Sequence, residues 1–468
     1  MRKTKIVCTI GPASASTEMQ IELIKAGMNV ARINFSHGSA EVYEKRVQNL
    51  KNAAARTGQP IAILADLQGP KIRVGEMEED KIYLPKGSIV NVTSENMIGN
   101  ARRFTINYPG LARDVGIGNV IFLDDGLIEL KVIELKDNDL VCSVEVGGEL
   151  APRKGVSLPG VLVDLPAVTK KDIEDIELAA KLEVDYLAIS FVRRAEHIKK
   201  VREILAGHGA DIDLVAKIES QEAIEHLDEI IAEADAVMVA RGDLGVEIPP
   251  ETVPIVQREI IKKCNAAGKP VITATQMLES MKKSPRPTRA EVTDVAHAIL
   301  DGTDAIMLSG ETAIGEYPVE AVKVMNKTAL VIEQSLSMDM LKHTNTASVS
   351  VADAISHATV QSANELNAAA IISSTQSGST AKKVAKFRPK AIVLAATPSD
   401  KVMRKLCLVW GIKPLLVPRT ADIDSMIDVS VEAGRLSGII REGDLIAITA
   451  GVKTDSPGST NLLKIHWA

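Results

Sequence analysis

Eight short runs of apolar and β-branched residues recur along the first two thirds of this chain. They lie at 5–10, 30–35, 61–66, 186–191, 214–219, 236–241, 271–276 and 305–309. Stretches with helical periodicity, such as 17–26 and 251–267, separate most of them. Eight strands alternating with helices are typical of a (β/α)8 TIM barrel, so we expect an α/β fold built on that barrel.

Two further regions depart from the barrel pattern. Residues 69–164 consist of short alternating runs with Gly and Asp turns, which predicts a β-barrel lid inserted above the strand ends. After a polar stretch around 338–348, runs at 368–373, 391–395, 413–417 and 444–449 predict a C-terminal α/β domain. We therefore expect a barrel at 1–68 and 165–337, a lid at 69–164 and a third domain at 346–468. Several domains are expected for 468 residues, because a chain of this length exceeds what one hydrophobic core usually supports.

Composition narrows the classes of partner. Aromatic residues make up 3% of the chain and the formal net charge is −6, so neither stacking nor charge favours binding to nucleic acid or to an acidic membrane. The four cysteines lack any CxxC spacing, which favours reduced thiols over disulfides or a zinc site. No run is as long as a membrane span and the N-terminus leads directly into a strand, so we expect a cytoplasmic protein.

Polar side chains stand at the carboxyl ends of seven of the eight runs, the edge of a barrel where catalytic residues gather. They are Arg32, Asn34, Ser36, Asp66, Ser190, Lys217, Glu219, Asp243, Thr275 and Ser309. A merely solvated rim would favour flexible Lys and Glu over this mixture, so we interpret it as a functional site.

Lys217 and Glu219 share one face of the fifth run, because residues two apart in a strand point to the same side, and Asp243 follows the sixth run. A buried ammonium beside carboxylates is costly unless it is paired or used. Within these segments two interpretations stay open with equal weight: a structural salt bridge, or a site in which Glu219 and Asp243 hold a divalent metal while Lys217 meets an anionic substrate.

Six segments resemble, in order, the signature segments of the pyruvate kinase family. They are MNVARINFSHG (28–38), LVAKIE (214–219), VMVARGDLGVEIP (237–249), VITATQMLESM (271–281), PRPTRAE (285–291) and DGTDAIMLSGETAIGEYP (301–318). The resemblance covers essentially the whole chain. It implies a homotetramer that transfers the phosphoryl group of phosphoenolpyruvate to ADP, through a metal-bound enolate, giving pyruvate and ATP in the last step of glycolysis.

The resemblance also implies roles for single residues. Glu219 and Asp243 would bind Mg²⁺ or Mn²⁺, and Lys217 would stabilise charge on the transferring phosphoryl group. Arg32 and Arg73 would supply cationic contacts to phosphate. The backbone of Arg241, Gly242 and Asp243 would meet the substrate carboxylate together with Thr275, which would also assist protonation of the enolate. Ser190 and Ser309 would complete the wall of the site and the proton path. Contacts to the nucleotide would come from Asn34, Phe35, Ser36, His37, Arg73 and Lys154.

Some of these residues have an ordinary alternative. His37 is read equally well as a polar residue at a helix start, and Lys154 as a solvated lysine. Residues 124–126, Asp-Asp-Gly, predict a hairpin turn that could also face the site from the lid.

The segment DLQGPKIRV (66–74) differs from the commonest family pattern. Asn34, Ser36, Asp66 and Leu67 match the monovalent-cation site, but Lys71 replaces the glutamate of K⁺-dependent members. An ammonium there can supply the charge that bound K⁺ would bring. The set resembles the K⁺-independent branch, so we predict activity without K⁺.

The C-terminal domain carries a second candidate site in SSTQSGSTAKK (373–383), which follows an apolar run and precedes a helical stretch. Such a loop can cradle the phosphate of a small-molecule effector, although it can also be a Ser-rich helix cap. By resemblance the effector residues are Ser374, Thr375, Ser377, Gly378, Ser379 and Thr380. The loop at 451–461 could close over the same ligand; it lacks the Trp and Arg of some members activated by fructose-1,6-bisphosphate, so a sugar monophosphate or AMP is equally plausible.

Two other functions are compatible with parts of this pattern. One is a barrel lyase that stabilises a pyruvate enolate with Mg²⁺ but transfers no phosphoryl group; the lid and Lys154 argue against it, because such a lyase has no nucleotide to enclose. The other is a catalytically inactive effector-binding protein, against which the joint presence of Arg32, Lys217, Glu219, Asp243 and Thr275 argues.

Overall fold

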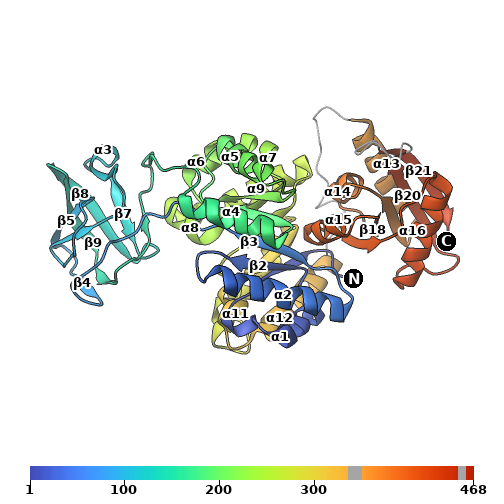
Figure 1. Ribbon diagram of the computed structural model, residues 1–468, viewed down its shortest axis with the longest axis horizontal. Helices are drawn as coiled ribbons and strands as arrows, with labels where there is room; N and C mark the ends of the chain where they lie inside the picture. Colours follow the sequence, from blue (N-terminus) through green and yellow to red (C-terminus); the bar gives the residue numbers. More distant parts are fainter. Residues whose placement is uncertain (336–349, 452–459) are drawn as a thin grey trace.

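The computed structural model describes residues 1–335, 350–451 and 460–468. The polar stretch at 338–348, the expected domain limits at 337 and 346, and most of the loop at 451–461 lie outside the described residues. The chain forms three bodies in a row, with a barrel between a β-rich lid at one end and an α/β domain at the other (Figure 1). No helix in the described ranges has both the length and the apolar character needed to cross a membrane.

The central body is a closed barrel of eight strands, each pairing in parallel with its neighbours. The strands, in chain order, are β1 (Lys5–Thr9), β2 (Val30–Asn34), β3 (Ala62–Asp66), β12 (Tyr186–Ile189), β13 (Asp213–Ile218), β14 (Ala236–Ala240), β15 (Val271–Ala274) and β16 (Ala305–Leu308). All eight predicted runs are therefore strands, and the TIM-barrel prediction is confirmed. Val30, Leu64 and Val215 are among the side chains that fill its interior.

Helices surround the barrel and bury their apolar faces against the strands. The longer ones are α1 (Thr17–Ala26), α2 (Ala40–Thr57), α4 (Lys170–Leu182), α5 (Ala195–Gly207), α7 (Leu227–Glu233), α9 (Val253–Ala267), α10 (Arg289–Leu300) and α12 (Pro318–Ser335). Short helices lie near the strand ends: α6 (Gln221–Glu225), α8 (Arg241–Glu247) and α11 (Gly310–Ala313), with 3₁₀ turns at Pro12–Ser14, Pro250–Thr252 and Glu279–Lys282.

Seven of the eight barrel strands end one or two residues before the runs that predicted them, and β3 ends with its run at Asp66. Phe191 and Thr275 were expected inside strands, but they have left-handed backbones with φ of +55° and +70°. The chain therefore turns sharply where it leaves β12 and β15.

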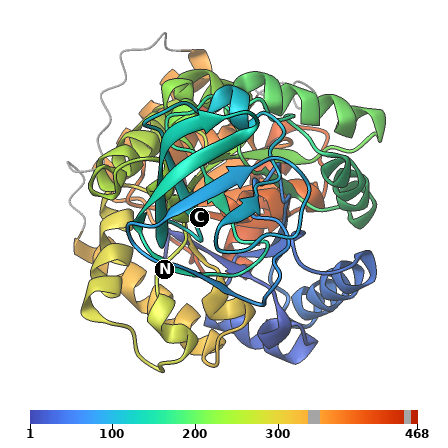
Figure 2. The same ribbon diagram turned by 90° about the vertical axis from the view of Figure 1, so that its left-hand side faces the viewer.

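The lid follows β3 and has its own core, formed by side chains such as Phe104 and Leu130. Its strands are β4 (Ile82–Leu84), β5 (Ile89–Thr93), β6 (Arg103–Thr105), β7 (Val120–Leu123), β8 (Ile128–Lys136), β9 (Asp139–Val146), β10 (Gly148–Leu150) and β11 (Val156–Ser157), with one short helix, α3 (Leu111–Asp114). Six of them form a curled sheet in the order β11-β7-β8-β9-β5-β6. Figure 2 shows this sheet lying in front of the ring of barrel helices.

The third body is a five-stranded sheet in the order β19-β18-β17-β20-β21. Four parallel strands match the predicted runs: β17 (Ala370–Ser374), β18 (Ile392–Thr397), β19 (Ile412–Leu416) and β20 (Leu445–Gly451). The helices are α13 (Val351–Glu365), α14 (Ser379–Lys386), α15 (Asp400–Lys405) and α16 (Ile423–Leu436), with a 3₁₀ turn at Leu406–Leu408. The edge strand β21 (Thr460–Trp467), antiparallel to β20, was not predicted, because its sequence is too polar to read as a buried parallel strand.

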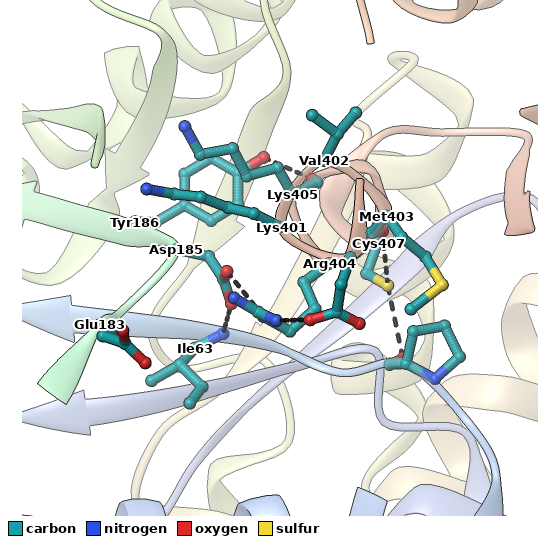
Figure 3. A network of polar contacts seen from close by, with 12 residues as sticks. Ile63, Glu183, Asp185, Tyr186, Lys401, Val402, Met403, Arg404, Lys405 and Cys407 are labelled. Carbon is teal, nitrogen blue, oxygen red and sulfur yellow. Dashed lines mark hydrogen bonds and ion pairs between the residues drawn. The ribbon is translucent and has the colours of Figure 1, made fainter. Parts of the chain in front are cut away.

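The third body packs against the amino-terminal ends of the barrel strands through a network of polar contacts (Figure 3). Asp185, which precedes β12, accepts hydrogen bonds from Arg404 Nε at 2.9 Å and from the backbone N–H of Ile63 at 2.8 Å. Tyr186 Oη donates to the carbonyl of Lys405, whose Nζ lies 2.6 Å from Asp213 Oδ1. Burial raises the pKa of Asp185 to about 6 against the opposing charge of Arg404. The opposite, carboxyl-terminal ends are thereby left to face the lid.

Candidate active site

Lys217 lies near the end of β13 with its side chain at the mouth of the barrel. Its Nζ donates to Ser190 Oγ at 2.7 Å and forms ion pairs with Glu219 Oε1 at 2.8 Å and Asp66 Oδ1 at 3.4 Å. Burial alone would lower the pKa of this amine, but the charges of Asp66 and Glu219 outweigh it and raise the pKa above its ordinary value. A permanently charged ammonium thus stands inside the barrel mouth, and the salt bridge of the simpler interpretation is present within the candidate site.

Asp66 also binds the next cation. Arg32 Nε donates to Asp66 Oδ2 at 2.6 Å, and Arg32 Nη1 donates to Thr9 Oγ1 at 2.9 Å. Burial opposes ionisation of Asp66, but Lys217 and Arg32 hold its pKa below the ordinary value. The carboxylate therefore fixes both predicted phosphate-binding cations beside each other. Thr9 was missed in the sequence, because its run was assigned to end at the apolar Ile10.

Glu219 and Asp243 form the carboxylate side of the cluster. Glu219 is 1% exposed and its Oε2 accepts the backbone N–H of Phe191 at 2.6 Å, while Asp243 lies in the first turn of α8. Burial raises the pKa of Glu219, and Asp243 adds to this shift against the opposing charge of Lys217. The two carboxylates thus repel each other beside the Lys217 ammonium.

These donors fit a divalent cation of the Mg²⁺ class. Within the described ranges no group of three or more His, Cys, Asp or Glu side chains is arranged to hold a metal. Mg²⁺ suits a site of one or two carboxylates, because it keeps several waters and takes further oxygen ligands from substrate phosphates. Hard carboxylate oxygens without thiolate or imidazole also disfavour zinc.

The loop after β15 packs against the start of α8. The backbone N–H of Gly242 donates to Thr275 Oγ1 at 2.8 Å. The Arg241 guanidinium donates to both carboxylate oxygens of Asp294, at 2.6 and 2.8 Å, and to the carbonyl of Thr275 at 2.7 Å. The Arg241 side chain is thus committed to holding the loop, and only its backbone faces the site at which the sequence predicted a substrate contact.

Ser309, after β16, has an unusual environment. Its backbone N–H donates to Glu311 Oε2 at 2.8 Å, while its buried Oγ has no hydrogen-bond partner among the described residues. Buried hydroxyls are normally paired. An unpaired one at a strand end beside the cluster fits the predicted role in the wall of a polar ligand site.

The residues of the monovalent-cation pattern are engaged within the protein. Asn34 Oδ1 accepts the backbone N–H of Ser36 at 3.0 Å, and the carbonyl of Leu67 accepts Ser190 Oγ at 2.7 Å. Lys71 Nζ lies 5.8 Å from the centre of the Phe191 ring, and its charge is felt by the nearby Glu219 carboxylate. Lys71 therefore brings positive charge close to the Glu219 carboxylate, from the segment that leads out of β3 into the lid.

A cavity of about 550 Å³ separates the lid from the barrel mouth. Among its lining residues are His37, Lys71, Arg73, Asp124, Lys154 and Asp243. Lys154 Nζ pairs with Asp124 Oδ1 at 2.9 Å. Residues 124–126 form the hairpin turn between β7 and β8, with positive φ at each, and both aspartates line the cavity, so both interpretations of that motif hold.

Phe35 is placed differently from the other predicted nucleotide contacts. It is 1% exposed and its ring stacks on Tyr43 at a centroid distance of 4.5 Å. Only its backbone lies near the site, since the Phe35 N–H donates to the carbonyl of Asp66. The side chain serves the core.

The predicted effector residues gather in the turn between β17 and α14. The backbone N–H of Gly378, at φ +83°, donates to Thr375 Oγ1 at 2.9 Å, and Ser374 Oγ lies 3.1 Å from Ser430 Oγ. Thr380 Oγ1 lies 2.7 Å from Thr460 Oγ1, while Ser377 and Ser379 flank Gly378. A cavity of about 570 Å³ adjoins this turn and is lined by Gln376, Ser399, Leu416 and Arg419, among others.

Two family models match the chain. The model described as pyruvate kinase, barrel domain, matches residues 1–322, and the one described as pyruvate kinase, alpha/beta domain, matches residues 353–466. A pyruvate kinase from Geobacillus stearothermophilus is 50% identical over 470 residues, which cover 99% of this chain and 80% of the relative. One from Staphylococcus epidermidis is 48% identical and covers 100% of this chain and 80% of the relative.

A crystal structure of a pyruvate kinase from Cryptosporidium parvum matches with a TM-score of 0.95 at 39% sequence identity. The match covers 100% of this chain and 96% of that one. Sequence and architecture therefore agree along the full length, through barrel, lid and C-terminal domain. The chain belongs to the pyruvate kinase family.

Proposed function

We propose that the phosphoryl transfer of this family, from phosphoenolpyruvate to ADP, takes place at the mouth of the barrel around Lys217. The observation that carries this proposal is the position of one charged, buried ammonium, which pairs with Glu219 and Asp66 beside Arg32. The charge of Asp243, which lines the cavity under the lid, also acts on this ammonium. Positive charge held in a water-poor site stabilises charge that develops on a transferring phosphoryl group.

The Lys217 ammonium donates to Ser190 and forms ion pairs with Glu219 and Asp66. A phosphoryl oxygen that approaches it must therefore replace one of these acceptors. Glu219 is the acceptor to be replaced, because together with Asp243 it would hold Mg²⁺ or Mn²⁺. A divalent cation bound there supplies positive charge to the phosphoryl and enolate oxygens.

The carboxylate of phosphoenolpyruvate would meet the backbone of residues 241–243 and the hydroxyl of Thr275. Gly242 allows close approach, since a Cβ at this position would lie 3.6 Å from Thr275 Oγ1 and would fill the space next to it. Thr275 would also help to deliver the proton to the enolate carbon, and the unpaired hydroxyl of Ser309 would accept a hydrogen bond within the same wall.

ADP would occupy the cavity between the lid and the barrel. Arg73 and Lys154 from the lid would meet its phosphates, together with His37 and the polar chain from Asn34 to Ser36. The Lys154–Asp124 pair is partly exposed and therefore weak, so a phosphate can displace the carboxylate at little cost.

A coupled assay tests this activity directly. The protein, supplied with phosphoenolpyruvate, ADP and MgCl₂, should produce pyruvate and ATP in equal amounts. Pyruvate is measured by the oxidation of NADH with lactate dehydrogenase, and ATP is measured with luciferase. Pyruvate formed without ATP would indicate a lyase or phosphatase reaction and would reject the assignment.

We propose further that the turn from Ser374 to Thr380 binds the phosphate of a small-molecule effector. Its support is the glycine-centred turn at the start of α14 and the adjoining cavity. Fructose-1,6-bisphosphate, ribose-5-phosphate and AMP should be screened for a shift in the concentration of phosphoenolpyruvate that gives half-maximal rate. The double variant S377D/S379D should abolish the shift by charge repulsion while the rate without effector is unchanged.

The assembly and the domain limits belong to the same proposal. A homotetramer should elute from gel filtration with a light-scattering mass about four times the 50.1 kDa of one chain. We take the domains to be 1–68 with 165–337, 69–164, and 346–468; limited proteolysis should cut first near those limits.

A further inference from the structure

The lid is joined to the barrel by two segments, an outgoing hinge (67–71) and a returning hinge (161–166). Both contact one short segment, Ser190–Arg193, which follows β12 and is called the β12 joint here. None of the roles assigned above explains why a single four-residue segment should contact both hinges.

The outgoing hinge packs tightly on the first half of the joint. The carbonyl of Leu67 accepts Ser190 Oγ at 2.7 Å, and Lys71 lies over the Phe191 ring. Gly69 has φ +68°, and a Cβ added to it would lie 2.8 Å from Ser190 Cβ. The hinge and the joint are thus in van der Waals contact with no room for a side chain between them.

The returning hinge is bound by the last residue of the joint. Arg193 Nη1 donates to the carbonyl of Val163, and Arg193 Nη2 donates to the carbonyl of Leu165 at 2.7 Å. The planar fork of a guanidinium can span two carbonyls two residues apart, whereas an ammonium is a point donor. Arg193 also lines the cavity under the lid.

The joint touches the phosphoryl-transfer cluster as well. Ser190 Oγ accepts the Lys217 ammonium at 2.7 Å, and the Phe191 N–H donates to Glu219 Oε2 at 2.6 Å. Phe191 adopts φ +55°, a strained conformation for this residue, which persists only when its surroundings enforce it. Movement of either hinge is therefore transmitted within one or two residues to the groups that hold Lys217 and Glu219.

We infer that Arg193 is a positioning residue, which fixes the returning hinge to the β12 joint. The lid is thereby held where Arg73 and Lys154 can contact ADP while ADP lies next to Lys217 and Glu219. This inference rests on the proposed placement of ADP under the lid. Arg193 acts through the lid and makes no contact with the reacting atoms.

Two variants and one matched control test the role. R193K keeps the charge but cannot bind both carbonyls, and R193Q removes the charge as well. Arg194 is the control: it is the next residue in the chain, and its guanidinium pairs with Glu222 at 2.8 Å rather than with the hinge. R193K should raise the KM for ADP at least threefold and R193Q at least tenfold, while the KM for phosphoenolpyruvate stays within twofold and R194Q matches the unaltered enzyme.

Lid position gives a readout independent of turnover. All four native cysteines are buried, so dyes can be attached to E134C on the lid and K199C on the barrel helix α5. The distribution of dye distances should be broader in R193K than in the unaltered background, both without ligand and with ADP and MgCl₂. R194Q, the matched control, should give the same distribution as the unaltered background.

An unchanged KM for ADP together with an unchanged distance distribution in R193K would overturn the inference, and so would equal increases in both KM values. R193K decides the matter if R193Q does not fold. Absence of turnover in the unaltered chain would instead overturn the proposed function, and the distance distribution would still decide whether Arg193 holds the hinge.

Discussion

At the scale of single residues, the cluster at the barrel mouth is organised by shared partners. Asp66 binds Arg32 with one carboxylate oxygen and Lys217 with the other, and Glu219 balances the same ammonium from the opposite side. Ion pairs this deeply buried are poor sources of stability, because the desolvation of each charge offsets their attraction. Their arrangement is therefore better explained by the charge that a substrate brings.

Replacing Lys217 by Met should reduce turnover by about three orders of magnitude or more, because no other cation occupies its position next to the phosphoryl group. Binding of Mn²⁺ to Glu219 and Asp243, followed by electron paramagnetic resonance, should persist. K154M is the comparison variant and should mainly raise the KM for ADP. A loss of less than tenfold in K217M would show that its role has been wrongly assigned.

Lys71 gives a second prediction about a single charge. The unaltered enzyme should show the same rate with KCl as with tetramethylammonium chloride at equal ionic strength. K71E should lose most activity in tetramethylammonium and regain it with KCl, because a carboxylate at this position creates a site for K⁺ and removes the built-in cation. Strong activation of the unaltered enzyme by KCl would contradict this view.

The limits of sequence reasoning are also visible at this scale. Lys217, Glu219, Asp66 and Arg32 could be placed together because strand periodicity and the barrel topology determine which end each occupies. The contacts of Arg193 could not, because its partners are backbone carbonyls of the returning hinge, which leave no pattern in the sequence. The burial of the Phe35 side chain in the core was equally hidden, so that only its backbone lies near the predicted nucleotide contacts.

At the scale of elements, the ends of the strands matter more than the strands themselves. β-Branched runs located all eight barrel strands, yet the last residues of seven runs lie beyond the strand end. The loop after β15 is the clearest example, since Thr275 and Gln276 both have positive φ. Such a conformation is held by tertiary contacts that local sequence does not encode.

Asp294 on α10 provides a test of this loop. It binds the Arg241 guanidinium through both carboxylate oxygens, and Arg241 in turn binds the carbonyl of Thr275. D294N should lower kcat about tenfold by loosening Thr275, with little change in the KM for ADP. R258Q is a suitable control, because Arg258 is exposed and pairs with Asp301 rather than with Arg241 or the loop after β15. Equal effects on kcat and on the KM for ADP would argue against a local role.

At the scale of the whole molecule, the barrel separates the candidate active site from the turn proposed to bind an effector. The lid covers the carboxyl-terminal ends of the strands, and the C-terminal domain packs on the amino-terminal ends (Figures 1 and 3). The division of the chain into barrel, lid and C-terminal domain was predictable from the change in residue pattern along the sequence. The contacts between barrel and C-terminal domain were not, because they join residues about two hundred positions apart, such as Asp185 and Arg404.

The buried Asp185 should make stability depend on pH. Its folded-state pKa of about 6 lies above the ordinary value of 3.8, so the folded protein keeps this proton to higher pH than the unfolded chain does. The stabilisation is complete below about pH 4 and is lost as the pH rises through about 6.

Urea unfolding of the unaltered protein and of D185N, measured between pH 4 and pH 7, tests this dependence. As the pH rises from 4 to 7, the unaltered protein should lose about 2 kcal/mol of unfolding free energy relative to D185N. Asn is nearly isosteric and does not titrate, so the difference isolates this carboxyl group. A difference that is constant across this range would show that Asp185 ionises normally.

Strand β12 runs between these two faces. Asp185 immediately precedes it, and Ser190 follows it, about 17 Å further along the chain at the usual rise of an extended strand. A ligand that displaces α15 thus acts on one end of a strand whose other end holds the lid. Thermodynamic linkage then requires reciprocity. If an effector changes the affinity for nucleotide by a given factor, the nucleotide must change the affinity for that effector by the same factor.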